Sequence, residues 1–174
     1  MKKALIIFGT TAALLAGVLS PTSFAAENVD GNVSQNGMSS AAAKIKRVNE
    51  SEPNDSFTKA TNFSFDDYVT PDDQYYVILD GEMSNDSDFD YFRFQAPKTG
   101  TFTIDCGVLQ YVPAGDLEVV LYSKTGAVLK SKKLNSRNEL RFDYQLSKDQ
   151  VYYIGIESMY SKRFDYTIDF FEVK

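Results

Sequence analysis

The sequence predicts an all-β domain in which two sheets pack face to face. From residue 75 to the C-terminus, short runs rich in Val, Ile, Phe, Tyr and Thr recur, and Gly, Asn, Asp and Pro separate them. A spacing of about 8 to 12 residues between such runs is typical of β-sandwiches and barrels. Apolar and polar residues also alternate within several runs, so each strand has one apolar face that a second sheet can bury.

Eight strands are expected. Cys106 shares the apolar face of its strand with Phe102 and Ile104, so we expect it to be a small buried hydrophobic residue. Residues 56–63 are the one stretch where a helical turn is expected, capped by Asn54 or Asp55. The predicted strands are Tyr75–Leu79, Asp90–Gln95, Thr101–Val108, Leu117–Ser123, Val128–Leu134, Glu139–Leu146, Val151–Ser158 and Phe164–Glu172.

The N-terminal part of the chain is predicted to lie outside the folded domain. Two lysines, an uncharged apolar run and a Ser-Phe-Ala site make residues 1–25 a secretory signal peptide, so we expect a secreted protein. Residues 26–47 contain no aromatic residue and are rich in Asn, Ser, Gly and Ala, which predicts a flexible linker. The β-sandwich domain is predicted to occupy residues 48–174.

Composition excludes several classes of function. The chain has 18 Lys and Arg against 24 Asp and Glu, a formal net charge of -6, which disfavours nucleic-acid binding because phosphate contacts need a basic surface. It has no His and one Cys, so Ser-His-Asp and Cys-His nucleophiles, His-ligated zinc and a disulfide within the chain are excluded. Paired carboxylates can hydrolyse glycosides. In this chain, however, the carboxylates are gathered in loops and there is no Trp, so we expect no enzymatic activity.

Two acidic clusters carry the most information about function. The first places Glu50, Glu52, Asn54 and Asp55 within six residues, and the second places Asp86, Asp88 and Asp90 at alternate positions. Asp88 and Asp90 have the same parity as Phe92 and Phe94, so we expect both to point toward the core. A buried carboxylate needs a partner, because an unpaired charge in the interior costs too much free energy.

A calcium ion is the partner that these clusters predict. Ca²⁺ takes 6 to 8 oxygen ligands from carboxylates, amides, carbonyls and water. An EF-hand is excluded, because Tyr91 and Pro97 stand where that loop needs Gly and Glu. The site must therefore be assembled by tertiary contact between the two clusters. The alternative is that both clusters are solvated acidic loops.

The order of several short motifs resembles the bacterial pre-peptidase C-terminal domain, a family that includes the collagen-binding domains of secreted bacterial collagenases. The resemblance runs over about residues 50–170 and implies an antiparallel, jelly-roll-like β-sandwich with calcium tying its N-terminal segment to a sheet. The motifs are Glu50-Ser51-Glu52-Pro53-Asn54-Asp55, Gly81, Asp88-Phe89-Asp90-Tyr91-Phe92-Arg93-Phe94, Gly100-Thr101-Phe102-Thr103-Ile104, Asp116-Leu117-Glu118-Val119-Val120-Leu121-Tyr122 and Tyr152-Tyr153-Ile154-Gly155-Ile156.

The resemblance also implies site residues. It puts calcium ligands at Glu50, Glu52, Asn54 and Asp55 and at Asp90, with either Asp88 or Asp86 as a further acidic ligand. Relatives that bind collagen use exposed tyrosines on one sheet face. Tyr122 and Tyr153 lie opposite the apolar parity of their strands, so they are candidate ligand-binding residues. The alternative is that both tyrosines pack beside their neighbours on a half-exposed face.

Two functions fit these observations. The first is a secreted, non-catalytic, calcium-stabilised binding module that attaches to an extracellular polymer or protein. The second is an inhibitor or folding helper of a secreted protease. In either case we expect a monomer that contacts neither nucleic acid nor membrane.

Overall fold

The computed structural model describes residues 46–65 and 74–174, which belong to one compact unit, residues 39–174. The predicted signal peptide and most of the predicted linker lie outside the described residues. Within the described ranges no helix is long and apolar enough to cross a membrane. The strands are β1 (Lys46–Asn49), β2 (Thr61–Asn62), β3 (Tyr76–Met83), β4 (Phe89–Gln95), β5 (Gly100–Val108), β6 (Leu117–Ser123), β7 (Val128–Lys133), β8 (Leu140–Leu146), β9 (Val151–Ser158) and β10 (Phe164–Glu172).

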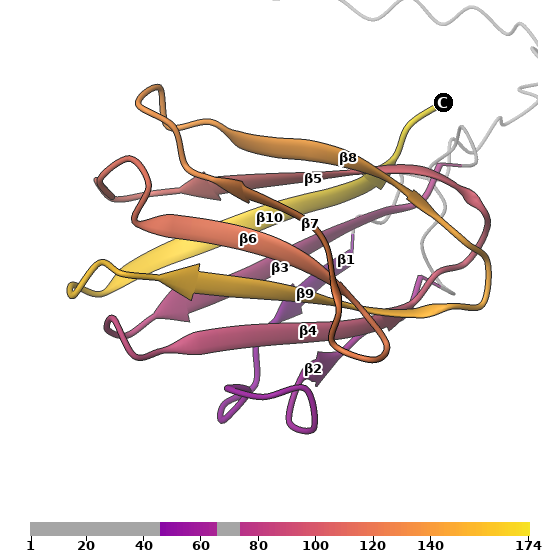
Figure 1. Ribbon diagram of the computed structural model, residues 1–174, viewed down its shortest axis with the longest axis horizontal. Helices are drawn as coiled ribbons and strands as arrows, with labels where there is room; N and C mark the ends of the chain where they lie inside the picture. Colours follow the sequence, from indigo (N-terminus) through magenta and orange to yellow (C-terminus); the bar gives the residue numbers. More distant parts are fainter. Residues whose placement is uncertain (1–45, 66–73) are drawn as a thin grey trace, which may run out of the picture. The chain divides into compact units, whose positions relative to one another are not determined.

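The strands form a β-sandwich of two five-stranded sheets (Figure 1). One sheet has the order β1-β3-β10-β5-β8 and the other the order β2-β4-β9-β6-β7. Pairing among β3 to β10 is antiparallel, and within that set the first strand pairs with the last and the second with the next to last. This is the strand order of a jelly roll. The predicted all-β sandwich is therefore confirmed.

The prediction missed the two N-terminal strands. β1 pairs with β3 and β2 with β4, and both pairings are parallel, so neither sheet is wholly antiparallel. The described residues form ten strands rather than eight. Lys46 and Arg47, which the prediction placed in the linker, lie in β1. Where a helical turn was expected at residues 56–63, the structure has a single turn, closed by the Lys59 N–H on Ser56 O (3.0 Å), and then β2.

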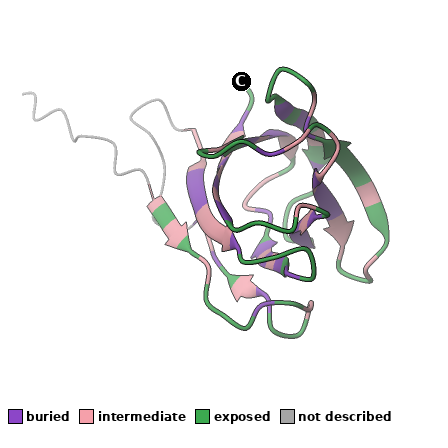
Figure 2. Ribbon diagram, turned by 90° about the vertical axis from the view of Figure 1, so that its left-hand side faces the viewer, coloured by how far each residue is buried: buried purple, intermediate pink, exposed green. Residues whose placement is uncertain are grey.

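The core lies between the sheets and contains a cluster of aromatic rings. The ring of Phe94 in β4 lies 4.9 Å from that of Phe170 in β10 and 5.2 Å from that of Phe63, which follows β2. Cys106 is buried there, as the alternation predicted. Buried residues line the inside of the sandwich, whereas the loops are mostly exposed (Figure 2). Strand alternation therefore determines which side chains reach the core.

We expect Phe94→Ala to be among the most destabilising core substitutions. Phe94 is 1% exposed and contacts aromatic rings from both sheets, so truncation leaves a cavity and lowers the free energy of unfolding by about 3–5 kcal/mol. Urea denaturation measures the change. Val128→Ala, at a side chain that is 61% exposed, is the control and should change stability by less than about 0.5 kcal/mol. Equal effects of the two substitutions would contradict this description of the core.

Candidate metal centre

The segment from β1 to β2, residues 46–62, connects one edge of each sheet, and we call it the strap. The strap is tied to β3 where the Glu50 N–H donates to Asp80 O (2.9 Å). The loop between β1 and β2 is closed where the Ser51 N–H donates to Thr61 Oγ1 (2.9 Å). The strap begins in the sheet of β3 and ends in the sheet of β4. Residues 50–54, which follow β1, therefore lie beside the start of β4.

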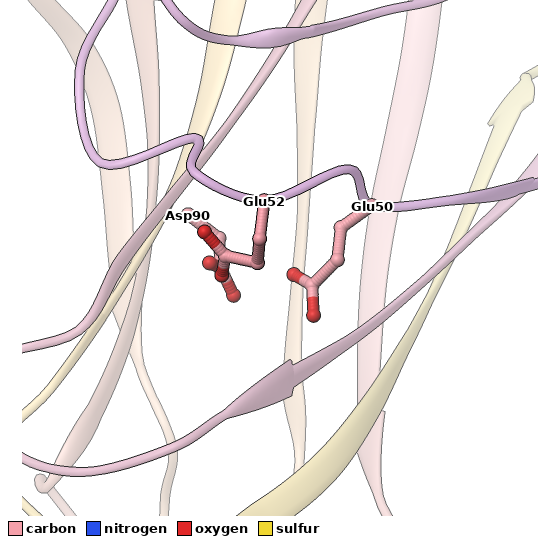
Figure 3. Close-up of side chains that lie close together, drawn as sticks. All are labelled: Glu50, Glu52 and Asp90. Atoms are coloured by element: carbon pink, nitrogen blue, oxygen red, sulfur yellow. The ribbon is translucent and has the colours of Figure 1, made fainter.

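Three carboxylates meet at this place (Figure 3). Glu50 and Glu52 come from the strap and Asp90 from the second residue of β4. One oxygen of each carboxylate lies within 4.8 Å of the others. Glu52 is exposed, Glu50 is half-buried and Asp90 is 0% exposed. Three negative charges this close repel one another strongly, so the cluster needs a proton or a cation between its oxygens.

Asn54 adds a fourth polar group to the cluster. It is 0% exposed, and one end of its amide lies 3.0 Å from Asp90 Oδ1 and 3.2 Å from Glu52 Oε2. With the NH₂ group at that end, the amide donates a hydrogen bond to each carboxylate. With the carbonyl oxygen there, the amide completes a set of four oxygens, which needs a cation or a carboxyl proton between them. The two amide orientations therefore suit the cation-free and the cation-bound site.

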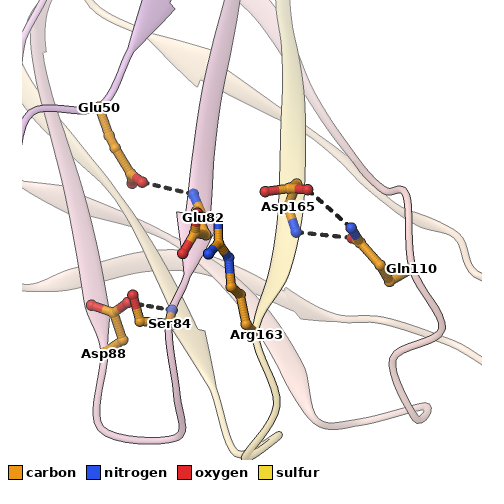
Figure 4. A network of polar contacts seen from close by, with 7 residues as sticks. All are labelled: Glu50, Glu82, Ser84, Asp88, Gln110, Arg163 and Asp165. Atoms are coloured by element: carbon orange, nitrogen blue, oxygen red, sulfur yellow. Dashed lines mark hydrogen bonds and ion pairs between the residues drawn. The ribbon is translucent and has the colours of Figure 1, made fainter.

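Tyr166 on β10 holds the carboxylates from the core side. Its hydroxyl lies 2.7 Å from Asp90 Oδ2 and 3.1 Å from Glu50 Oε2. A hydroxyl has one proton to donate, so the second of these contacts needs a proton on the carboxyl groups or a cation nearby. Glu50 Oε1 in turn accepts a hydrogen bond of 2.7 Å from the Glu82 N–H (Figure 4).

Gly81 makes room for this arrangement. A Cβ atom at residue 81 would lie 2.2 Å from the Tyr166 hydroxyl oxygen and 2.5 Å from Glu50 Oε2. Both distances are shorter than any real Cβ contact, so a side chain here would displace the tyrosine or the carboxylate. Glycine at residue 81 is therefore required for Glu50 and Tyr166 to meet.

The surroundings raise the pKa of two of the carboxyl groups. Burial, joined by the negative charges of Glu50 and Asp88, raises the pKa of Asp90 to about 9, although the Tyr166 hydrogen bond acts in the opposite direction. Burial also raises the pKa of Glu52, and the nearby charges of Asp88, Glu50 and Asp55 add to this effect. Without a cation, Asp90 therefore holds a proton at neutral pH.

The structure brings together four of the seven predicted ligands, Glu50, Glu52, Asn54 and Asp90. Asp88 is 8% exposed, as its parity predicted, and its Oδ2 accepts a hydrogen bond from the Ser84 N–H (2.6 Å; Figure 4). Asp55 and Asp86 are exposed and lie outside the group of three converging carboxylates. The pattern of acidic residues did not predict the part played by Tyr166. A tyrosine on an apolar strand face was the available signal, because a buried hydroxyl needs a polar partner.

The predicted exposed platform of Tyr122 and Tyr153 is wrong. Both tyrosines do lie on the outer face of the second sheet, but Tyr153 is 9% exposed and Tyr122 is half-buried. Phe57 of the strap covers them, with ring centroids 5.2 Å from Tyr122 and 4.6 Å from Tyr153. It also lies 4.8 Å from Tyr91. The tyrosines therefore anchor the strap to the sheet and are not free for an extended ligand.

Asp90→Asn should remove the pH dependence that Asp90 gives to the metal-free site. A raised folded pKa means that the stabilising proton is present below the unfolded pKa of about 3.9 and is lost as the pH rises toward about 9. Asparagine has no such proton to lose. In chelator, the free energy of unfolding of the variant minus that of the wild type should therefore grow with pH, by at most about 1.4 kcal/mol per pH unit. Urea titrations across this pH window measure it, and a constant difference would contradict it.

No known protein-family model matches the chain, and no curated protein sequence matches it. Among solved structures, it is similar to the pre-peptidase C-terminal domain of a collagenase from Bacillus anthracis, with 12% identity, a TM-score of 0.49 and coverage of 64% of this chain and 93% of that one. It is also similar to PliG, a periplasmic inhibitor of g-type lysozyme from Aeromonas hydrophila. The identity is 10% and the TM-score 0.43, and the match covers 64% of this chain and 95% of that one. A third likeness is to a Yersinia pseudotuberculosis-derived mitogen. The identity is 13% and the TM-score 0.44, and the match covers 57% of this chain and 86% of that one. These are distant likenesses, and they assign no ligand to this chain.

Proposed function

We propose that the protein is a secreted, non-catalytic binding module whose strap is held in place by calcium. The observation that carries the proposal is the convergence of Glu50, Glu52 and Asp90 around a space that the Asn54 amide also faces. These side chains come from two segments about 40 residues apart in the sequence, and Ca²⁺ prefers oxygen ligands of these kinds. Secretion rests on the N-terminal segment of the sequence, which lies outside the described residues.

The chemistry of the donor groups fits a hard divalent cation. All four groups offer oxygen, and the chain contains no His, so the softer metals that need imidazole or several thiolates are disfavoured. A bound cation supplies positive charge that keeps Asp90 ionised in its buried position. Water can complete the coordination, because Glu52 is at the surface.

Calcium binding at this place would fix the strap to the sandwich. Glu50, Glu52 and Asn54 belong to the strap and Asp90 belongs to β4, so a shared ion links the two. Phe57, further along the strap, covers three tyrosines of the second sheet. We expect the strap to be held at two points, one ionic and one aromatic, with the ionic point depending on extracellular calcium.

Calcium should raise the melting temperature of metal-free protein. Extracellular calcium sites have dissociation constants of about 10⁻⁴ to 10⁻³ M, so about 10 mM calcium should add roughly 1.4–2.7 kcal/mol of stability. That corresponds to a rise of roughly 5 to 10 °C for a domain of this size. Because protons compete for the carboxylates, the rise should be smaller at acidic pH. Scanning calorimetry with and without chelator measures the shift.

Asp90→Asn is the matching test variant, because it keeps the shape of the side chain and an acceptor for Tyr166 while it removes the charge. It should fold and lose most of the calcium response. Asp143→Asn, on the outer face of the first sheet, is the control and should keep the full response, since Asp143 lies in a hydrogen bond with Thr103 away from the cluster. An identical melting curve for the wild type in calcium and in chelator would overturn the proposed calcium site.

A further inference from the structure

Exposed hydrophobic side chains gather at one end of the sandwich. Six large hydrophobic side chains are exposed among residues 46–65 and 74–174, and four of them lie in or beside the loops β3–β4, β5–β6 and β9–β10. Because successive strands from β3 to β10 alternate in direction, these loops share one end of the molecule, seen at the left of Figure 1. The four are Phe89 (38% exposed), Leu109 (82%), Tyr111 (73%) and Met159 (74%).

Hydrogen bonds hold two of these loops in fixed positions relative to each other. The Met159 N–H donates to Asp116 O (2.7 Å), which joins loop β9–β10 to loop β5–β6. Gln110 makes two further bonds of 2.9 Å with Asp165, one through its NH₂ group and one through its carbonyl oxygen (Figure 4). A loop whose backbone is already fixed loses little backbone entropy on binding, which favours its use as a contact surface.

A groove of about 190 Å³ lies beside two of these four side chains. Phe89 and Met159 form part of its wall. Lys133 is its one basic residue, and the Lys133 Nζ is 3.6 Å from Glu118 Oε2, a long contact for an ion pair. The groove therefore carries three more negative charges than positive ones. Its four acidic residues are Asp86, Asp116, Glu118 and Glu157.

We propose that this groove binds a lysine or arginine side chain of a partner protein, with apolar residues on either side of that basic residue packing on Phe89 and Met159. The excess negative charge complements a basic side chain, and exposed Met and Phe at the rim suit its apolar neighbours. The same charge repels nucleic acid. This inference rests on the binding part of the proposed function and is independent of its calcium part.

Selection from a phage-displayed library of random peptides, with the full-length chain immobilised in calcium, tests the proposal. We expect enriched peptides to contain Lys or Arg beside Leu, Phe, Met or Trp. A synthetic peptide with the enriched sequence should bind about tenfold more weakly to Met159→Ser and to the double variant Asp116→Asn, Glu118→Gln. Replacing its basic residue by Gln should cause a similar loss. Isothermal titration calorimetry measures these affinities.

The controls separate this proposal from the calcium site. Val128→Ser and Asp143→Asn change an exposed hydrophobic residue and a carboxylate away from the groove, and should keep the affinity unchanged. Met159→Ser should keep the full calcium-induced rise in melting temperature. The proposal is overturned if no sequence is enriched above the bare support, if the enriched peptides lack a basic residue, or if the groove variants bind as the wild type does. Retention of the chain on an insoluble polysaccharide through the same residues would also overturn it.

Discussion

The strap's position depends on how the charge of one buried carboxylate is compensated. Asp90 lies at the edge of the sandwich and has no exposed surface. The two carboxylates that converge on it, those of Glu50 and Glu52, come from the strap, whose two strands the sequence did not predict. Burying a lone carboxylate is unfavourable, and burying it beside two others is more so. The hydrogen bond from Tyr166 reduces this cost, as does one from Asn54 when its NH₂ group faces the carboxylates, but neither group supplies positive charge. Under the proposed function, replacing the proton by a cation would therefore hold the strap more firmly.

The rest of the sandwich is built so that the strap has to occupy this edge. β3 and β4 each end a jelly-roll sheet, and β1 and β2 cover them with parallel pairings. Gly81 leaves the space in which Glu50 meets Tyr166, and Gly155 leaves space for the rings of Tyr91 and Tyr122 on the other face. Both glycines lie within strands, where they cost backbone entropy. The same strap thus depends on close packing at each of its two anchoring points.

Strand alternation explains why much of the fold could be predicted from the sequence. A period of two fixes which residues face the core, and it also placed Asp88 and Asp90 inward, which the structure confirms. β1 and β2 could not be found in this way, because they are four and two residues long and half-exposed. Parity places Tyr122 and Tyr153 on the outer face, but it cannot show that Phe57 covers them. What covers an outer face depends on a distant segment, and alternation within one strand contains no such information.

The surfaces of the described residues differ in what they offer a partner. The strap covers the tyrosines of the second sheet, and on the outer face of the first sheet Arg47 pairs with Asp80 and Arg141 with Asp105. At the opposite edge, Lys130 and Lys132 donate to the backbone oxygens of Asp143 and Arg141, so they occupy acceptors that an added strand would need. The loops at one end differ, because they expose large apolar side chains on a backbone already fixed by hydrogen bonds. Under the proposed function, these loops are the surface best suited to contact a partner, and the strap would stabilise the sandwich beneath them.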